Sequence, residues 1–504
     1  MRKRIFAWTV LLCAAVSMNG QVCQPTEMAY RVKDEAFNQS HIDSLAHFMT
    51  DKLGPRLAAS KMKLRAEQMV ADKLKEYGFS NVRIEEACDF SKGGWDNEKN
   101  YVAMTAPYYC SFAANPKAWS GSTNGLVKGE CVLLEVTDTL DIEKYRGKLA
   151  GKIVLMPPTR EYELSFRPLA SRYTDEDLKE MAQDNRPNKP WIRRAGYGQD
   201  RALRNAIDSL IKTEAPIAVM VGDGTFNVPG SRGVRYKVGD PEPVPEIVLP
   251  IEDHGRMVRL VKGGEKVEME LDVRNVFTDN QKINNVYAEI PGTDPKLKNE
   301  VVLIGAHLDS WHGGTGGADN ASGCITMMEA LRILKALDIK PRRTIRLALW
   351  GGEEQGLFGS SGYAKKNLYD RDAKKKQQGY DDFALYLNVD NGSGKFRGIC
   401  LEENDMAFPY FEAWKKPLES LGFNTLSPSK SGATDHVIFS RIGLPAYQFI
   451  QDPLDYFRTY HSTMDTYERL SFDDLKVNAA LAAWLAYCAA MDNGRIPAKP
   501  GFPK

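Results

Sequence analysis

A chain of 504 residues is longer than a typical single domain, and its length predicts two to four domains. Its hydrophobic fraction of 43% and its charged fraction of 26% are ordinary for a globular protein. The formal net charge of +1 lacks the basic excess that is typical of nucleic-acid binding, so we expect no nucleic-acid partner.

The N-terminus has the layout of a secretory signal peptide. A short basic start, Met1 to Arg4, precedes an apolar run from Ile5 to Met18, and the segment ends at Asn19-Gly20. The run is short for a helix that spans a bilayer, and an N-terminal membrane anchor is the alternative. We therefore expect a signal peptide over 1–20 and an exported protein, periplasmic or extracellular, with no membrane partner after cleavage.

Two helices and a strand are predicted before residue 90. Apolar residues recur at helical spacing over 42–53, and a second helix over 64–77 ends at Gly78, a good C-cap. A strand is expected over 82–87. We assign residues 21–120 to the N-terminal part of the main domain.

The pattern changes between residues 125 and 275. Short apolar runs separated by Gly and Pro predict a β-rich module. These runs lie at 131–136, 152–156, 217–221 and 247–249. A polar, arginine-bearing segment over 157–204 lies inside the module. We predict that residues 121–278 form a domain inserted between the two parts of the main domain.

From residue 283 onwards strands alternate with helices. This alternation predicts an α/β fold, an α/β/α sandwich with a mixed, mostly parallel central sheet. The expected strands are 301–306, 344–350, 384–389 and 446–450. A helix is expected over 322–337, and a C-terminal helix begins at Ser471, where Asp474 resembles the partner in a capping box. The second part of the main domain is assigned to 279–495, and 496–504 to a tail.

Groups that suit metal binding or proton transfer follow three of the predicted strands. His307 follows the first strand, Glu353 and Glu354 follow the second, and Asp390 follows the third. Ligands in open α/β sheets gather at the carboxyl ends of the strands. Three strand ends that each carry such a group therefore predict one shared site.

The tetrad His-x-Asp-Ser occurs twice, at 41–44 and at 307–310. Only the second copy follows a buried strand, so His41 is predicted to be a surface or helix-end residue. Asp319 precedes a helix, where an acid is often only an N-cap, but the neighbouring candidates favour metal binding. His461, in a loop before the terminal helix, is a further candidate.

The chemistry of these candidates favours zinc, which binds mixed imidazole and carboxylate ligands. Asp319, Glu354 and Asp390 would supply three negative charges and a bridging hydroxide a fourth, against the four positive charges of two zinc ions. Of the adjacent glutamates, one can bind the ion while the other takes a proton from metal-bound water. His312 and His436 cannot be assigned by spacing.

These residues resemble the co-catalytic zinc peptidases of the aminopeptidase and glutamate carboxypeptidase family, and its secreted carboxypeptidase Q-like members in particular. Five segments match in the family's order: His307 to Ser310, Gly317 to Gly323, Gly352 to Ser360, Asp390, and His461 with Asp465-Thr466. The resemblance covers about 30–120 and 280–495, the catalytic domain. The inserted module is similar to a protease-associated domain through its segment Gly147 to Leu155.

The resemblance implies two zinc ions per chain, which five side chains of the protein would bind. One ion would be bound by His307 and Asp390, the other by Glu354 and His461, and both by Asp319. Glu353 would be the general base, which deprotonates the bridging water and passes the proton to the leaving amine. Asp309 would orient His307. The resemblance also implies a cis peptide between Asp319 and Asn320.

We therefore expect a secreted zinc exopeptidase of the aminopeptidase type, with peptides as substrates and a homodimer as an open question. A carboxypeptidase or dipeptidase of the same family stays open as well, because arginines of the insert are candidates to bind a free carboxylate: Arg167, Arg172, Arg186, Arg193, Arg194 and Arg201. A non-catalytic receptor-like homologue and a single-zinc glutaminyl cyclase are disfavoured by the complete ligand set.

Overall fold

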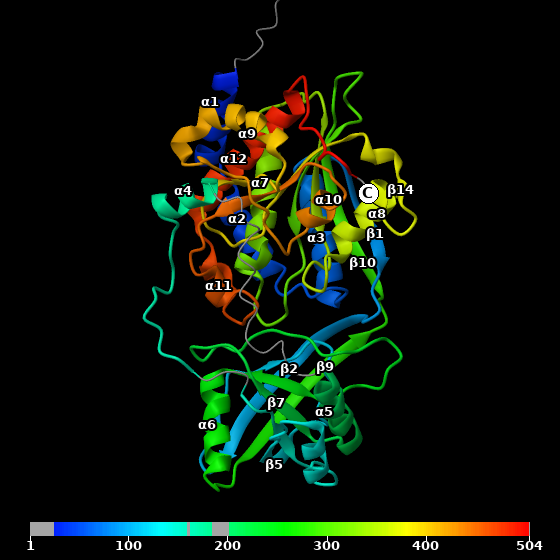
Figure 1. The fold of residues 1–504 in the computed structure, drawn as a ribbon, viewed down its shortest axis with the longest axis vertical. Coiled ribbons are helices and arrows are strands. Elements are labelled where there is room, and N and C mark those ends of the chain that lie inside the picture. The colour runs from blue at the N-terminus through cyan, green and yellow to red at the C-terminus, as the bar shows by residue number, and fades with distance from the viewer. Residues whose placement is uncertain (1–24, 159–161, 184–200, 503–504) are drawn as a thin grey trace, which may run out of the picture.

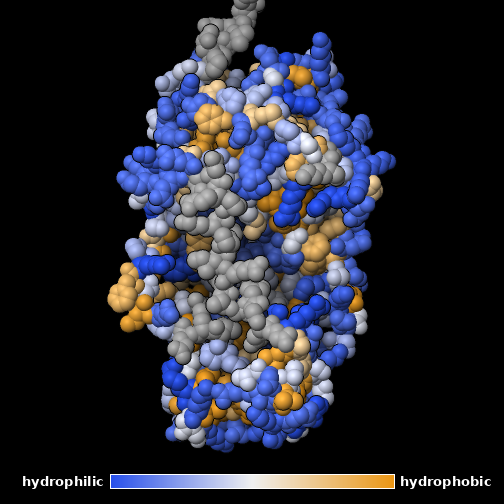
Figure 2. Space-filling model, in the orientation of Figure 1, coloured by the Kyte–Doolittle hydropathy of each residue, from blue (hydrophilic) through white to orange (hydrophobic). Residues whose placement is uncertain are grey.

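The computed structural model describes residues 25–158, 162–183 and 201–502. The expected signal peptide and the candidates Arg186, Arg193 and Arg194 lie outside the described residues. Within the described ranges, no helix has both the length and the apolar character that crossing a membrane requires. The face of the molecule in Figure 2 is mostly hydrophilic, with apolar residues scattered between charged ones.

An eight-stranded mixed sheet forms the centre of the upper body in Figure 1. Its strands, in spatial order, are β1 (Ser80–Asp89), β10 (Lys282–Ile290), β12 (Thr344–Trp350), β11 (Val301–His307), β15 (Phe383–Asn388), β18 (Ala446–Gln451), β16 (Phe396–Cys400) and β17 (Thr425–Ser427). The four strands β12, β11, β15 and β18 run parallel to one another, and antiparallel pairs flank them. The four strands predicted from apolar runs are these four central ones.

Helices cover both faces of this sheet, because successive strand residues point to opposite sides. In β11, Val302 and Ile304 pack into one apolar cluster, whereas Leu303 belongs to a second cluster on the other face. The first face is covered by α1 (Pro25–Asn38), α2 (Ile42–His47), α3 (Lys61–Glu76), α7 (Ser322–Ala336), α9 (Phe408–Lys415) and α12 (Phe472–Met491). The second is covered by α8 (Phe358–Asn367) and α10 (His436–Ser440). The predicted α/β/α sandwich is confirmed.

The ends of two predicted helices follow local sequence signals. Ser471 is the residue before α12, as expected, but its side chain makes no capping bond to the helix amides; its hydroxyl donates instead to Asp474 Oδ2 at 2.8 Å, so the capping box is not formed. His41 stands before α2, is exposed, and contacts the hydroxyl of Tyr77 at 3.2 Å. The prediction that the first His-x-Asp-Ser tetrad is a helix-end feature is confirmed.

A second eight-stranded sheet forms the lower body in Figure 1. Its strands, in spatial order, are β3 (Cys110–Ser111), β2 (Gly94–Ala106), β9 (Glu268–Thr278), β5 (Val127–Leu133), β6 (Ile153–Leu155), β7 (Ala218–Gly222), β8 (Glu246–Leu249) and β4 (Asn115–Pro116). The helices α5 (Arg201–Glu214) and α6 (Ile251–Lys262) pack on this sheet. A separate two-stranded hairpin, which belongs to neither large sheet, consists of β13 (Tyr369–Asp370) and β14 (Lys375–Lys376).

The long antiparallel pair β2 and β9 was not predicted. The middle of β2 is polar and exposed, so no apolar run marks it in the sequence. Because β2 belongs to the second sheet, that sheet begins at Gly94, within the range assigned to the first part of the main domain. The limits 121–278 therefore stay a prediction.

One segment of the insert leaves the lower body and reaches the upper one. Figure 1 shows α4 (Asp175–Gln183) beside the upper body, where it packs against β17. Just before α4, the amide of Ser171 donates to the carbonyl of Leu454 at 3.0 Å. Arg172 pairs with Asp452 at 2.9 Å and with Asp474 at 2.8 Å. These contacts hold the segment before α4 against the loop that follows β18.

Candidate metal centre

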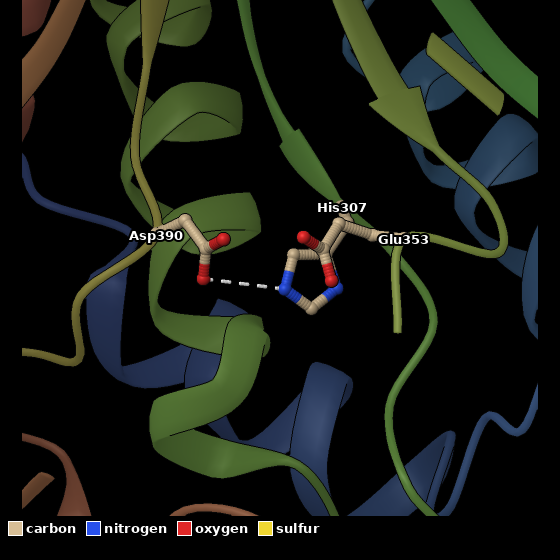
Figure 3. Close-up of side chains that lie close together, drawn as sticks. All are labelled: His307, Glu353 and Asp390. Atoms are coloured by element: carbon tan, nitrogen blue, oxygen red, sulfur yellow. Dashed lines mark hydrogen bonds and ion pairs between the residues drawn. The ribbon is translucent and has the colours of Figure 1, made fainter. Parts of the chain in front are cut away.

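The ends of three neighbouring parallel strands place the predicted side chains together. His307 is the last residue of β11, which lies between β12 and β15. Glu353 follows β12 after two glycines, and Asp390 follows β15 after Val389. Because the three strands are parallel and in register, their carboxyl ends meet at one edge of the sheet. Figure 3 shows the three side chains facing one another.

The first ligand group consists of His307, Glu353 and Asp390. Each offers one ligand atom, and these atoms lie within 4.8 Å of one another. His307 Nε2 is 3.3 Å from Asp390 Oδ1, the contact dashed in Figure 3. The His307 side chain is only 1% exposed. We call this set the His307 group.

The second ligand group consists of Asp319, Glu354 and His461, whose ligand atoms also lie within 4.8 Å of one another. His461 Nε2 is 2.8 Å from Glu354 Oε2 and 3.1 Å from Asp319 Oδ2. The other oxygen, Asp319 Oδ1, is 3.2 Å from His307 Nε2. We call this set the His461 group. The Asp319 carboxylate faces both groups, as a bridging ligand does, and the structure brings all six predicted residues together.

These distances fit metal binding. Donor atoms around a tetrahedral zinc ion, with bonds of about 2.0–2.1 Å, lie about 3.3 Å apart. Moreover, Glu354 Oε1 is buried and has no hydrogen-bond partner among the described residues, which is costly for a carboxylate oxygen. Mixed imidazole and carboxylate donors suit zinc better than calcium or magnesium. The residues present therefore fit two divalent ions.

The electrostatics of the protein without metal point the same way. Burial raises the pKa of Glu353 well above its usual value, and it raises the pKa of Glu354 to about 7. Burial lowers the pKa of His461, but the Glu354 charge and contacts with Asp319 outweigh it and raise that pKa well above its usual value. The raised pKa of His461 reflects the negative charge of the neighbouring carboxylates, which also attracts cations to this site.

Asp319 is positioned by its backbone. The Asp319–Asn320 peptide is cis, as the resemblance implied. The carboxylate of Asp465 accepts from the amides of Ala318 at 2.6 Å and of Asp319 at 3.0 Å. Asn320 donates to the carbonyl of Val389, next to Asp390, at 2.8 Å. The bridging carboxylate is thus tied to the loops that carry both groups.

Asp309 has a different main contact from the one expected. Its carboxylate accepts from the amides of Glu353 at 3.1 Å and of Glu354 at 3.2 Å. His307 Nδ1 lies 3.7 Å from that carboxylate but 3.0 Å from the backbone carbonyl of Asp309. Asp309 therefore orients His307 through its backbone, while its side chain positions the two glutamates.

Arg56 supports the site and was missed in the sequence. It is 0% exposed, and its guanidinium donates to the carbonyls of Leu308 at 2.7 Å, Thr315 at 2.7 Å and Gly316 at 3.0 Å. These residues belong to the loop that joins His307 to Asp319. A lone arginine between apolar residues gives no signal, because its partners are backbone carbonyls about 250 positions away in the chain.

The two unassigned histidines lie outside both groups. His312 Nε2 lies 2.6 Å from the carbonyl of Pro116 in the second sheet, and its ring packs against Trp95. Burial lowers the pKa of His312 to about 4, so the ring is neutral. His436 Nε2 lies 3.1 Å from Glu402 and 3.0 Å from the Ser431 hydroxyl.

The described arginines of the insert also lie outside the two groups. Arg167 and Arg201 are exposed, and Arg172 is engaged by Asp452 and Asp474. All six described cysteines are free thiols: Cys88, Cys110, Cys131, Cys324, Cys400 and Cys488.

Comparison with known proteins agrees with this geometry. Residues 285–486 match the family model of peptidase family M28. Carboxypeptidase Q of Rattus norvegicus is 26% identical over 89% of this chain and 85% of that protein. Leucine aminopeptidase 2 of Trichophyton equinum is 33% identical over 44% of this chain and 43% of that protein. The resemblance carried by the motifs is confirmed.

Solved structures support the same fold. A peptidase M28 precursor from Shewanella amazonensis has a TM-score of 0.68 at 24% identity, over 94% of this chain and 99% of that chain. BSAP, a zinc aminopeptidase from Bacillus subtilis, has a TM-score of 0.53 at 20% identity, over 90% of this chain and 95% of that chain.

Proposed function

We propose that the chain, which matches the family model of peptidase family M28 over residues 285–486, is a zinc exopeptidase of the aminopeptidase type. The observation that carries this proposal is the Asp319 carboxylate, which presents one oxygen to each ligand group. The proposed ligands are His307 and Asp390 for one zinc ion, Glu354 and His461 for the other, and Asp319 for both. A carboxypeptidase or dipeptidase is the second candidate, because relatives named carboxypeptidase Q align with most of the chain.

The proposed chemistry divides between the two adjacent glutamates. Zinc held by these residues would supply Lewis-acid chemistry, polarising the carbonyl of a scissile peptide and making a water more acidic. Glu353 accepts a proton from that water at its carboxylate and delivers it to the leaving amine. Asp309 fixes the turn that carries both glutamates, so their carboxylates keep separate tasks.

The proposal extends to the whole chain. A signal peptide over 1–20 directs export, residues 21–120 and 279–495 form the catalytic domain apart from the strands β2 to β4, which join 121–278 in the protease-associated domain, and 496–504 form a tail. The apolar run at the N-terminus supports export, and the second sheet supports a separate β-rich module.

The test is a panel of dipeptides and end-blocked tripeptides, assayed with the zinc-loaded protein and with the metal-stripped protein as control. An aminopeptidase cleaves peptides with a blocked carboxyl end and not those with a blocked amino end, and a carboxypeptidase shows the reverse. Cleavage of free dipeptides alone identifies a dipeptidase. Failure to release any free amino acid, with zinc bound, contradicts the proposed exopeptidase.

A further inference from the structure

The inserted module is in direct contact with the loop that carries His461. Gly230 and Ser462 form an antiparallel β-bridge. On either side of it, the amide of Ser231 donates to the carbonyl of His461 at 2.7 Å, and the amide of Thr463 donates to the carbonyl of Pro229 at 3.3 Å. Residues 229–231 therefore act as a short strand, which we call the module strand, and hold residues 461–463.

His461 needs such external support. Its φ is +52°, in the left-handed region, a strained conformation for a non-glycine residue that persists only where the surroundings fix it. Its side chain is 40% exposed, whereas the His307 side chain is almost fully buried. The neighbours Thr459, Ser462 and Asp465 are buried, and the bonds from the module strand fix the backbone at His461 itself.

Asn115 fixes the module strand. It lies in β4, pairs with Val248 of β8, and is 4% exposed. Its Nδ2 donates to the carbonyl of Gly230 at 3.1 Å and to the hydroxyl of Ser231 at 2.9 Å. Both acceptors belong to the module strand that binds the His461 loop. Loss of this amide leaves two acceptors without their donor.

The loop from His307 to Asp319 meets the same point. A Cβ on Gly313 would lie 2.3 Å from Ser231 Oγ and 2.6 Å from Asn115 Nδ2, so no side chain fits there. The neighbouring His312 contacts the carbonyl of Pro116, the residue after Asn115. Asn115 thus lies where the module strand, the His461 loop and the loop to Asp319 come together.

We propose that Asn115 is a positioning residue for His461, through which the inserted module sets the zinc affinity of the His461 group. It touches no ligand directly, and it acts by holding Gly230 and Ser231 against the His461 loop. The His307 group is built on strand ends and does not depend on this contact. The inference rests on the proposed zinc function.

The test is a chelator titration of the zinc-loaded full chain, in which bound zinc is counted at each chelator concentration. Asn115→Ala is expected to release one zinc ion at about 10–100-fold lower chelator concentration than the wild type, the usual effect of losing a ligand's supporting partner. The second ion is expected to dissociate as in the wild type. A titration that is unchanged, or in which both ions weaken equally, overturns the inference.

The matched control is Asn275→Ala. Asn275 is also a buried asparagine of the second sheet, and its Nδ2 donates to the carbonyls of Ser120 and Gly121, at 3.1 and 2.8 Å. The Asn275→Ala substitution therefore removes a buried side-chain amide from the second sheet without removing a contact of the module strand. We expect both zinc ions to be retained as in the wild type, even if stability falls.

A double variant separates positioning from general damage. If Asn115 acts through His461, adding Asn115→Ala to His461→Ala changes zinc release no further. Additive losses overturn the inference. Should Asn115→Ala not fold, Ser231→Ala removes one of the two acceptors and is expected to weaken the same ion to a smaller degree. A wild type that binds no zinc refutes the proposed function itself, whereas a wild type with two ions and an unaffected Asn115→Ala variant refutes this inference alone.

Discussion

The two ligand groups differ in what holds their histidines. His307 ends a buried strand of the central sheet, between two parallel neighbours, and its side chain is almost inaccessible. His461 lies on a loop with a left-handed backbone, is partly exposed, and is bonded through its carbonyl to the inserted module. One half of the centre is therefore built by the sheet, and the other half by a contact between separate parts of the chain.

The largest effect on turnover is expected for a substitution of Glu353, because its proposed role differs from that of the metal ligands around it. Glu353 lies within the His307 group, yet as a general base it is not needed to hold an ion. We expect Glu353→Gln to lower kcat by about 10²–10⁴-fold while both zinc ions are retained. Steady-state kinetics with metal analysis measures both.

The neighbouring substitution Glu354→Gln is its natural counterpart. It is expected to lose zinc from the His461 group, because one of that group's ligands is weakened. Near-wild-type turnover in Glu353→Gln, or full zinc occupancy in Glu354→Gln, would show that the two roles are assigned wrongly.

Removing each histidine in turn tests the comparison directly. A total of about 10–16 kcal/mol shared over four zinc ligands gives about 3 kcal/mol each, so either variant is expected to weaken its own ion about 100-fold. We expect His307→Ala and His461→Ala to release different ions, which can be followed by chelator titration. His41→Ala, in the exposed copy of the tetrad, is the control and is expected to match the wild type. Equal loss of both ions in each variant would remove the distinction between the groups.

Arg56 offers a change that affects both groups together. A lysine keeps the charge but cannot reach all the carbonyls that the guanidinium binds, and bonds from charged donors contribute about 1.5–3 kcal/mol. We expect Arg56→Lys to lower the free energy of unfolding by about 2–3 kcal/mol and to weaken both ions, since the loop joins His307 to Asp319. Denaturant unfolding and zinc titration measure these effects, and a selective loss of one ion would contradict this account.

Arg172 is expected to give the smallest effect. Its side chain is 49% exposed, and Asp452 keeps Arg397 at 3.0 Å and the amide of Tyr173 at 3.1 Å when Arg172 is removed. Asp452 is buried, but solvent screens the half-exposed Arg172, and screened ion pairs contribute about 1 kcal/mol or less. We expect Arg172→Ala to lower stability by less than that and to leave zinc affinity unchanged. A thermal denaturation series with metal analysis checks both, and loss of zinc would mean that the segment before α4 controls the His461 loop.

The His307 group could be predicted from the sequence because its signals are local. Buried strands appear as continuous apolar runs, and the polar residue after each run marks a strand end. Once two strands are parallel neighbours, the groups that follow them must meet, which is how His307, Glu353 and Asp390 were found before any geometry. The cis peptide at Asp319 and the ligand role of His461 came instead from the family motif.

The support for the His461 group could not be predicted. Asn115 stands before a proline in a two-residue strand, and its partners are Gly230 and Ser231, more than a hundred residues away. Arg56 likewise donates to backbone carbonyls, and because every residue has a carbonyl, the sequence does not reveal which ones are its partners. β2 was missed because its middle is polar and exposed, and β9 was missed because its buried apolar residues alternate with polar ones and form no continuous run. Contacts between segments that lie far apart in the sequence can be identified only in the three-dimensional structure.

The central claim is that two zinc ions share Asp319, and an anomalous-difference map of zinc-loaded crystals tests it most directly. We predict two peaks about 3.5–4 Å apart, the usual spacing of bridged two-metal sites, with the Asp319 carboxylate between them. A single peak, or two peaks that do not share Asp319 as a ligand, would contradict the account.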